Sequence, residues 1–327
     1  MNFQTAEVYL IKGEGKRKHM DNFTNKVKII TEYDQEFHTL ISQADLPDLA
    51  ITEENSEANI LLASPPKIAS ILDSFPQLEW VQSMYAGVDA LTHSSQDPDY
   101  LLTNVKGIFG PQIAEYVLGY TIEHFRHWDL YRQQQSEKVW QPHRYRTING
   151  KQMFIFGTGS IGNHLAKTAA AFGVHTIGVN RTGIPPKESA FNEVVHIEQV
   201  NEQLKRADIV VSTLPKTTAT TGLFNQSLFE HCTKALFFNV GRGDAVVTED
   251  LLAALDNGAI QHAYLDVFIN EPISQQCPYW HHPSVTVTPH IAANSFPELV
   301  FEIFKQNYLL WRDGFQLNNR IDFNKGY

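Results

Sequence analysis

The chain has 327 residues, which is too long for one ordinary hydrophobic core and suits two domains. Its content of 43% hydrophobic and 19% charged residues is typical of a soluble globular protein. The formal charge of -10 argues against nucleic acid as a partner, because binding to phosphates needs clustered Lys and Arg.

The cysteine pattern and the N-terminal sequence favour a cytoplasmic location. Cys232 and Cys277 lie in no Cys-x-x-Cys pattern, so neither a disulfide framework nor a zinc site is predicted. The N-terminus shows no apolar run after a basic start, and no stretch approaches the roughly 18 apolar residues of a membrane span. We therefore expect a cytoplasmic protein without a membrane partner. The basic run Lys16-Arg17-Lys18 is expected to be a solvated loop.

Short apolar runs alternate with amphipathic stretches in the first third of the chain. The stretch Lys67–Phe75 has a helical pattern. The predicted strands are Glu7–Ile11, Val27–Thr31, Leu49–Thr52, Asn59–Ala63 and Trp80–Met84. This alternation is the βαβ rhythm of a parallel sheet.

A long segment with few helix breakers, Gln112–Gln135, separates this series from a second one. Its apolar residues recur near helical spacing, so we predict one long helix that opens the second domain and bridges to the first.

The second series repeats the same rhythm. Its helices are expected at Ser160–Phe172, from Thr248 as the capping residue to Asp256 with Gly258 as terminator, and at Pro297–Trp311. Its predicted strands are Gln152–Phe156, His175–Val179, Ile209–Leu214, Ala235–Val240, Ala263–Phe268 and Val285–Thr288. The predicted fold class is α/β, with two Rossmann/flavodoxin-like, doubly wound parallel-sheet domains and a cleft between them. Residues 1–104 and 295–327 would form the substrate-binding domain, and residues 105–294 the dinucleotide-binding domain.

A glycine-rich turn follows the first strand of the second series. The turn reads Gly157-Thr158-Gly159-Ser160-Ile161-Gly162, and a helical pattern follows it. The first glycine permits a tight turn, the second lets a pyrophosphate approach, and the third allows close packing of helix and strand. The amides of Ser160 and Ile161 would face the diphosphate at the helix N-terminus. The pattern predicts a dinucleotide site; the alternative is a glycine turn with no ligand.

The end of the next strand indicates which dinucleotide is used. An NAD enzyme usually has Asp or Glu there to bind the ribose hydroxyls, but this chain has Asn180-Arg181-Thr182. Asn carries no charge to repel a 2′-phosphate, Arg181 can pair with one, and Thr182 offers a hydroxyl. We expect NADP(H) to be favoured, with NAD(H) possible. The alternative is that Arg181 is an exposed charge that stacks on the adenine of either cofactor.

Three later strands each end in a residue suited to the chemistry of a 2-oxo acid. Arg242 lies between two glycines past one strand, Glu271 past the next, and His290 past the one after. Ligands of open α/β sheets bind beyond the carboxyl ends of the strands, so these side chains are expected to meet in one cleft. Arg offers a planar fork to a carboxylate and a carbonyl, and His is suited to acid/base work near neutral pH.

With the motifs Gly157–Gly162, Arg242, Glu271-Pro272 and Pro289-His290, the sequence resembles the D-isomer-specific 2-hydroxyacid dehydrogenase family. The specific motifs cover about Glu79 to Pro297. The resemblance implies that His290 donates a proton to a 2-oxo acid, that Glu271 orients His290 and raises its pKa, and that Arg242 binds and polarises the substrate.

The resemblance also implies further site residues. The backbone amides of Ala86 and Gly87 would hold the substrate carboxylate. The residues that would line the cofactor, besides Arg242 and His290, are Ile113, Leu214, Pro215, Thr221, Val240, Gly241, Asp266 and Ala292. Asp266 would bind the carboxamide or only end a strand. His281-His282 has no partner at metal-ligand spacing, so no metal site is expected.

Within the family, Tyr116-Val117-Leu118, His124-Phe125-Arg126, Tyr131 and Trp140 resemble the glyoxylate/hydroxypyruvate reductase branch, which tends to use NADPH. A homodimer is implied by the resemblance alone. The pocket for the side chain of the oxo acid is expected around Ala50–Asn55 and Tyr85. The alternative from another class is a catalytically weak nucleotide-sensing binding protein on the same fold.

Overall fold

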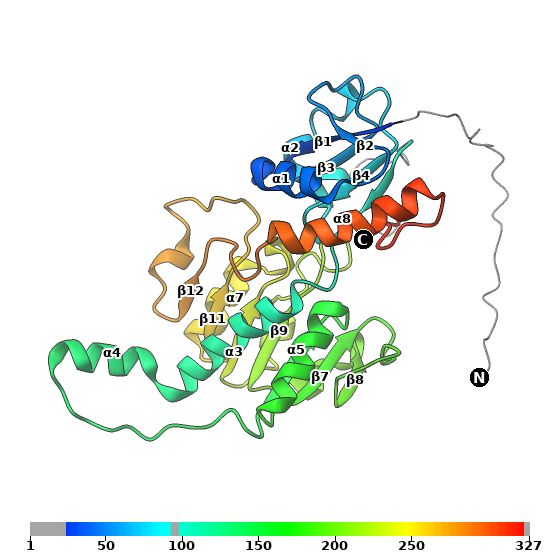
Figure 1. The fold of residues 1–327 in the computed structure, drawn as a ribbon. Helices are drawn as coiled ribbons and strands as arrows, with labels where there is room; N and C mark the ends of the chain where they lie inside the picture. The colour runs from blue at the N-terminus through cyan, green and yellow to red at the C-terminus, as the bar shows by residue number, and fades with distance from the viewer. Residues whose placement is uncertain (1–23, 93–97, 324–327) are drawn as a thin grey trace, which may run out of the picture.

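The computed structural model describes residues 24–92 and 98–323. The predicted strand Glu7–Ile11 and the basic run Lys16-Arg17-Lys18 lie outside the described residues. The fold contains two parallel sheets, as the alternation of elements predicts (Figure 1). One sheet has five strands and the other seven, and they include strands at Leu101–Thr103 and Glu193–His196 that were not predicted. No helix of the described part of the chain is long and apolar enough to cross a membrane.

The first sheet has the strand order β2-β1-β3-β4-β5. Its strands are β1 (Asn25–Ile30), β2 (Leu49–Ile51), β3 (Ile60–Ala63), β4 (Trp80–Ser83) and β5 (Leu101–Thr103). Helix α1 (Asp34–Ala44) and the late helix α8 (Pro297–Arg312) pack together against it. The buried Trp80 of β4 stacks on Phe304 of α8 with ring centroids 5.4 Å apart. Helix α8 thus buries its aromatic face on the first sheet. The chain has to return to that sheet after the last strand of the second sheet.

The second sheet has the order β12-β11-β10-β9-β6-β7-β8. Its strands are β6 (Gln152–Phe156), β7 (His175–Asn180), β8 (Glu193–His196), β9 (Ile209–Ser212), β10 (Ala235–Asn239), β11 (Ile260–Leu265) and β12 (Val285–Val287). All seven strands are parallel. From β6 the strand order moves toward one edge of the sheet through β7 to β8, and from β9 it moves toward the opposite edge through β10 and β11 to β12. The switch point between β6 and β9 is where ligands bind in open α/β sheets, beyond the carboxyl ends of the strands.

The helices of the second sheet are α5 (Ser160–Ala171), the short α6 (Gln226–Phe229) and α7 (Thr248–Asp256). Thr248 is the first residue of α7 and not its cap, because Val247 occupies the cap position and no side chain caps the helix. Gly258, with φ of +79°, lies just past the end of α7 as predicted.

The predicted long helix Gln112–Gln135 is two helices, α3 (Gly110–Arg126) and α4 (Trp128–Glu137). His127 between them has φ of 57°, the left-handed conformation that ends a helix. Helix α4 projects away from the rest of the molecule (Figure 1). A further difference concerns Lys67–Phe75, where the structure has the short α2 (Pro65–Ile68) and a 3₁₀ turn at Leu72–Ser74.

Candidate active site

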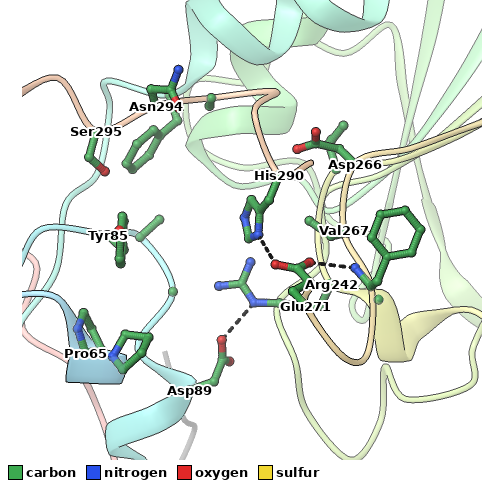
Figure 2. A pocket seen from close by; sticks show the side chains of 18 of the residues that line it. Pro65, Tyr85, Asp89, Arg242, Asp266, Val267, Glu271, His290, Asn294 and Ser295 are labelled. Atoms are coloured by element: carbon green, nitrogen blue, oxygen red, sulfur yellow. Dashed lines mark hydrogen bonds and ion pairs between the residues drawn. The ribbon is translucent and has the colours of Figure 1, made fainter. Parts of the chain in front are cut away.

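A cavity of about 580 Å³ is lined by residues that follow strands of both sheets. Arg242 follows β10, Glu271 follows β11 and His290 follows β12. These three strands are neighbours in the sheet, so their carboxyl ends bring the three side chains to one edge, as predicted. Figure 2 shows the three side chains near one another, with dashed lines that join His290 to Glu271 and Arg242 to Asp89.

His290 and Glu271 form a hydrogen-bonded pair. His290 Nδ1 lies 2.7 Å from Glu271 Oε2, and Glu271 Oε1 accepts a hydrogen bond of 2.8 Å from the backbone amide of Phe268. Both carboxylate oxygens are thus held, which fixes the carboxylate as the acceptor for the imidazole N–H. The pairing leaves Nε2 as the ring nitrogen for a substrate.

The hydrogen bond between His290 and Glu271 shifts the pKa of both side chains. The hydrogen bond to Glu271 raises the pKa of His290 above its ordinary value, although burial opposes this. Burial works to raise the pKa of Glu271, but the hydrogen bonds from His290 and the Phe268 amide outweigh it and lower that pKa. Glu271 is therefore ionised at neutral pH, and it stabilises the protonated form of His290.

Asp266 shapes the loop that carries His290. Its Oδ1 accepts hydrogen bonds from Thr288 Oγ1 (2.6 Å) and the Ile291 amide (2.8 Å), and its Oδ2 accepts one from the Ala292 amide (2.9 Å). These bonds hold His290 in its left-handed conformation, with φ of 53°. A carboxylate has about four acceptor positions, so Asp266 retains capacity for one further donor.

Arg242 reaches from the second sheet to a carboxylate of the first. Its Nε donates to Asp89 Oδ2 at 2.8 Å, and its Nη1 donates to the Gly241 carbonyl at 2.7 Å. A Cβ on Gly87 would lie 1.4 Å from Arg242 Nη2, so only glycine leaves room for the guanidinium. Arg242 is thus fixed on one edge, and its Nη2 end is presented beside the predicted carboxylate-binding loop.

The glycine turn has the geometry of a phosphate cradle. Gly157 has φ of +108°, and a Cβ on Gly162 would lie 2.0 Å from the Gly157 carbonyl oxygen. A Cβ on Gly159, by contrast, would meet nothing within 4 Å, so the space beside it is open. Helix α5 begins at Ser160, and its first amides point toward that space. These residues fit a dinucleotide diphosphate.

Asn180 builds the loop that follows β7. Its Nδ2 donates to Thr158 Oγ1 (3.0 Å) and to the Ile184 carbonyl (2.9 Å), while its Oδ1 accepts from the amides of Thr182 (3.0 Å) and Gly183 (2.7 Å). Both polar atoms of the Asn180 side chain are therefore hydrogen-bonded to other groups of the protein. It holds exposed Arg181 and Thr182 at the end of the strand, next to the glycine turn.

The structure brings together only part of the predicted site. The predicted residues that line the cavity are Ala86, Gly87, Ile113, Ile161, Val240, Arg242, Asp266, Glu271 and His290. The other predicted residues lie outside its lining, at the end of β7, in the first turn of α5 or in the loops after β6, β7, β9, β10 and β12: Gly157, Thr158, Gly159, Ser160, Gly162, Asn180, Arg181, Thr182, Leu214, Pro215, Thr221, Gly241 and Ala292. The Thr221 hydroxyl donates to the Thr217 carbonyl within its own loop and to Asp244 in the turn after β10.

Two parts of the cavity wall differ from expectation. The wall expected around Ala50–Asn55 is wrong, because β2 is the edge strand and none of these residues lines the cavity. The turn after β1 supplies Glu32 and the first residue of α2 supplies Pro65 instead, and Tyr85 is present as predicted. No role was predicted for Asp89 from the sequence, although it lies two residues after Gly87 of the predicted carboxylate-binding loop.

No group of three or more metal-ligating side chains occurs among residues 24–92 and 98–323. In the pair His281-His282, the second histidine lies 3.4 Å from Asp256 and accepts a hydrogen bond from the Ser284 amide.

Comparisons with known proteins find a matching family model and relatives of similar sequence. A family model described as the NAD-binding domain of D-isomer specific 2-hydroxyacid dehydrogenases matches residues 118–292. Over 275 residues the chain is 32% identical to a glyoxylate/hydroxypyruvate reductase A from Yersinia enterocolitica, covering 82% of this chain and 87% of that protein.

Two solved structures extend the similarity to the whole fold. A D-isomer specific 2-hydroxyacid dehydrogenase family protein from Aeromonas salmonicida superposes with a TM-score of 0.87 at 41% identity, covering 92% of this chain and 99% of the other. An NADPH-dependent glyoxylate/hydroxypyruvate reductase from Sinorhizobium meliloti, solved with NADP and sulfate, has a TM-score of 0.83 at 26% identity. That match covers 93% of this chain and 100% of the other.

Proposed function

This chain belongs to the D-isomer specific 2-hydroxyacid dehydrogenase family, and we propose that it reduces a short 2-oxo acid to the D-2-hydroxy acid with NADP(H) as the favoured cofactor. The observation that carries the proposal is the His290–Glu271 pair beside Arg242 in one cavity. A general acid, a carboxylate that keeps it protonated and a fork-shaped cation are what reduction of an anionic oxo acid requires.

In the proposed mechanism the protein binds, orients and protonates. Arg242 and the amides of Ala86 and Gly87 hold the substrate carboxylate, and Arg242 polarises the carbonyl oxygen as negative charge grows on it. The hydride for the carbonyl carbon would come from the nicotinamide of a dinucleotide held by the Gly157–Gly162 turn. His290 Nε2 donates a proton to the carbonyl oxygen, and Glu271 remains ionised and holds the Nδ1–H.

We further propose a division of labour between two domains. Residues 1–104 and 295–327 form the substrate-binding domain, and residues 105–294 form the dinucleotide-binding domain. The Arg242–Asp89 contact joins groups of the two domains at the cavity. Closure around the substrate would exclude water before hydride transfer.

The loop after β7 supports the preference for NADP(H). Arg181→Ala is expected to raise the KM for NADPH by about 10- to 100-fold, because a charge-assisted contact to the 2′-phosphate is lost. The KM for NADH should change by less than about threefold, since NADH has no 2′-phosphate. Initial rates with each cofactor measure both values. Equal losses for the two cofactors would show that Arg181 does not read the phosphate.

The pH dependence follows from the raised pKa of His290. Reduction needs protonated His290, so kcat/KM should fall as the pH rises through that raised pKa. In Glu271→Gln the imidazolium loses its charged partner, its pKa falls, and the decline should begin at a lower pH. Rates from about pH 5 to 10 in both proteins measure the shift. An unmoved profile would separate Glu271 from the protonation of His290.

A homodimer is also proposed. Helix α4 and the segment that follows it project from the molecule and expose Trp128, Val139 and Trp140, the last at 98% (Figure 1). Exposed apolar groups of this size mark interaction surfaces. Sedimentation velocity should give a dimer for the wild type and a larger monomer fraction for Trp140→Asp. A monomeric wild type would refute the proposal.

The direct test is absorbance at 340 nm with NADPH, then NADH, against glyoxylate, hydroxypyruvate, pyruvate and phenylpyruvate. Turnover with NADPH supports the reductase. Tight cofactor binding without turnover of any acid would favour the second candidate, a nucleotide-sensing binding protein on the same fold.

A further inference from the structure

The segment Tyr116-Val117-Leu118 of α3 has no part in the proposed chemistry, yet one of its side chains reaches the loop that carries His290. The Tyr116 hydroxyl lies 2.7 Å from Thr288 Oγ1, although the two residues are 172 positions apart in the sequence. Thr288 follows directly on β12 and precedes His290 by two positions. The contact therefore joins α3 to the start of the His290 loop.

The direction of this hydrogen bond follows from the partners of Thr288. Thr288 Oγ1 donates its one hydrogen to the buried carboxylate of Asp266, whose Oδ1 lies 2.6 Å away. Thr288 Oγ1 can therefore only accept from Tyr116, and the Tyr116 hydroxyl must donate. Burial raises the pKa of Tyr116, so this hydroxyl keeps its hydrogen at neutral pH. Tyr116, Thr288 and Asp266 thus form a directed series of hydrogen bonds, called here the Tyr116–Asp266 network.

Aromatic contacts fix the ring of Tyr116 at the start of this network. The ring meets that of Tyr120, one turn further along α3, edge-on with centroids 4.9 Å apart. Tyr120 in turn lies 4.8 Å from the ring of Tyr264 on β11, and the buried Tyr264 stacks on Phe238 at 4.6 Å. Because its ring is held against the core of the second sheet, Tyr116 offers its hydroxyl to Thr288 from a fixed position.

The other end of the network holds the backbone on both sides of His290. Asp266 accepts from the amides of Ile291 and Ala292, and the carbonyls of Asp266 and Thr288 both accept from the His290 amide, at 2.9 and 3.1 Å. Figure 2 shows Asp266 beside the segment that carries His290. His290 has the left-handed conformation, which costs a non-glycine residue free energy and persists only where its surroundings hold it.

We propose that Tyr116 and Thr288 are positioning residues for proton transfer: they fix Asp266, and through its bonds to the loop they direct His290 Nε2 toward the carbonyl oxygen of the substrate. The inference rests on the proposed function, in which His290 is the proton donor. Tyr116 and Thr288 lie outside the cavity lining, so they act through Asp266 and not on the substrate. Glu271 orients the imidazole, and the network places the backbone from which the imidazole extends.

Variants at the two positions test the network by the rate of a single turnover with NADPH and glyoxylate. Thr288→Val removes the hydroxyl at nearly constant shape, so the rate should fall by about 10- to 100-fold, the cost of a small displacement of a catalytic group. Tyr116→Phe leaves the bond to Asp266 in place, so the fall should be about three- to tenfold. Thr288→Ser keeps the hydroxyl and should restore most of the rate. The double variant should match Thr288→Val, since Tyr116 then has no partner to act through.

The solvent deuterium isotope effect distinguishes positioning from a general loss of structure. Proton transfer from a displaced imidazole is slower, so the isotope effect on the single-turnover rate should rise in Tyr116→Phe and Thr288→Val. A smaller fraction of folded enzyme would lower the rate and leave the isotope effect unchanged. Tyr120→Phe is the matched control, because Tyr120 belongs to the same helix and the same ring contacts but its hydroxyl is outside the network. Its rate and isotope effect should equal those of the wild type.

Three results would contradict the proposal. Unchanged rates in both Tyr116→Phe and Thr288→Val, with an active wild type, would overturn the role of the network and leave the reductase standing. Lower rates with an unchanged isotope effect, or losses that add in the double variant, would show that the two residues only stabilise the fold, and would overturn that role as well. Absence of turnover of every 2-oxo acid by the wild type would instead overturn the proposed function, and with it any role of the network in proton transfer.

Discussion

Replacing His290 by alanine is expected to lower kcat for reduction of a 2-oxo acid by about 10²- to 10⁴-fold, the usual contribution of general acid catalysis. The imidazole is the only acid that the described cavity lining places at the end of β12, and its Nδ1 is already bonded to Glu271. Without it, the alkoxide that forms on hydride transfer must take its proton from water. The dinucleotide site of Gly157–Gly162 is untouched, so NADPH should still bind.

Single-turnover rates and NADPH fluorescence titration measure these two effects separately. His281→Ala is the matched control, because His281 is an exposed histidine in the turn before β12 and outside the cavity lining. Its kcat should equal that of the wild type. A His290→Ala rate within about tenfold of the wild type would remove His290 from proton transfer.

Strand ends and the glycine turn could be read from the sequence because they depend on local patterns. A buried strand, a turn and a helix follow one another within Gln152–Ala171, and each part has its own residue signature. The order β10, β11, β12 then brings Arg242, Glu271 and His290 to one edge, since consecutive parallel strands are usually neighbours.

Other features depend on contacts between distant segments and left no local pattern. Asp89 meets Arg242 only because the first sheet faces the carboxyl end of β10, 153 positions further along the chain. Glu32 meets Tyr85 across 53 positions. The helix breaks at His127 because that residue adopts a left-handed conformation. The sequence gives no sign of this break, since histidine is not a usual helix terminator and the flanking residues continue the helical pattern.

The second large effect concerns Arg242. Arg242→Lys is expected to lower kcat/KM by about 10²-fold or more and to lower kcat itself, because lysine keeps the charge and loses the fork. In the wild type, Nε is bound to Asp89 and Nη1 to the Gly241 carbonyl, and these two bonds aim the remaining edge at the substrate. A lysine ammonium drawn to Asp89 cannot also reach the carbonyl oxygen of the substrate as negative charge develops on it.

Steady-state rates with a saturating 2-oxo acid separate affinity from rate for this variant. The matched control is Arg206→Lys, whose arginine pairs with Glu193 at the far side of the second sheet. If Arg242→Lys raised KM with kcat unchanged, the guanidinium would bind the ground state only, and polarisation of the carbonyl would have to come from His290 alone. A fall in kcat instead places the fork in the transition state, and it gives a reason for Gly87, since any Cβ there would displace the group that the reaction needs.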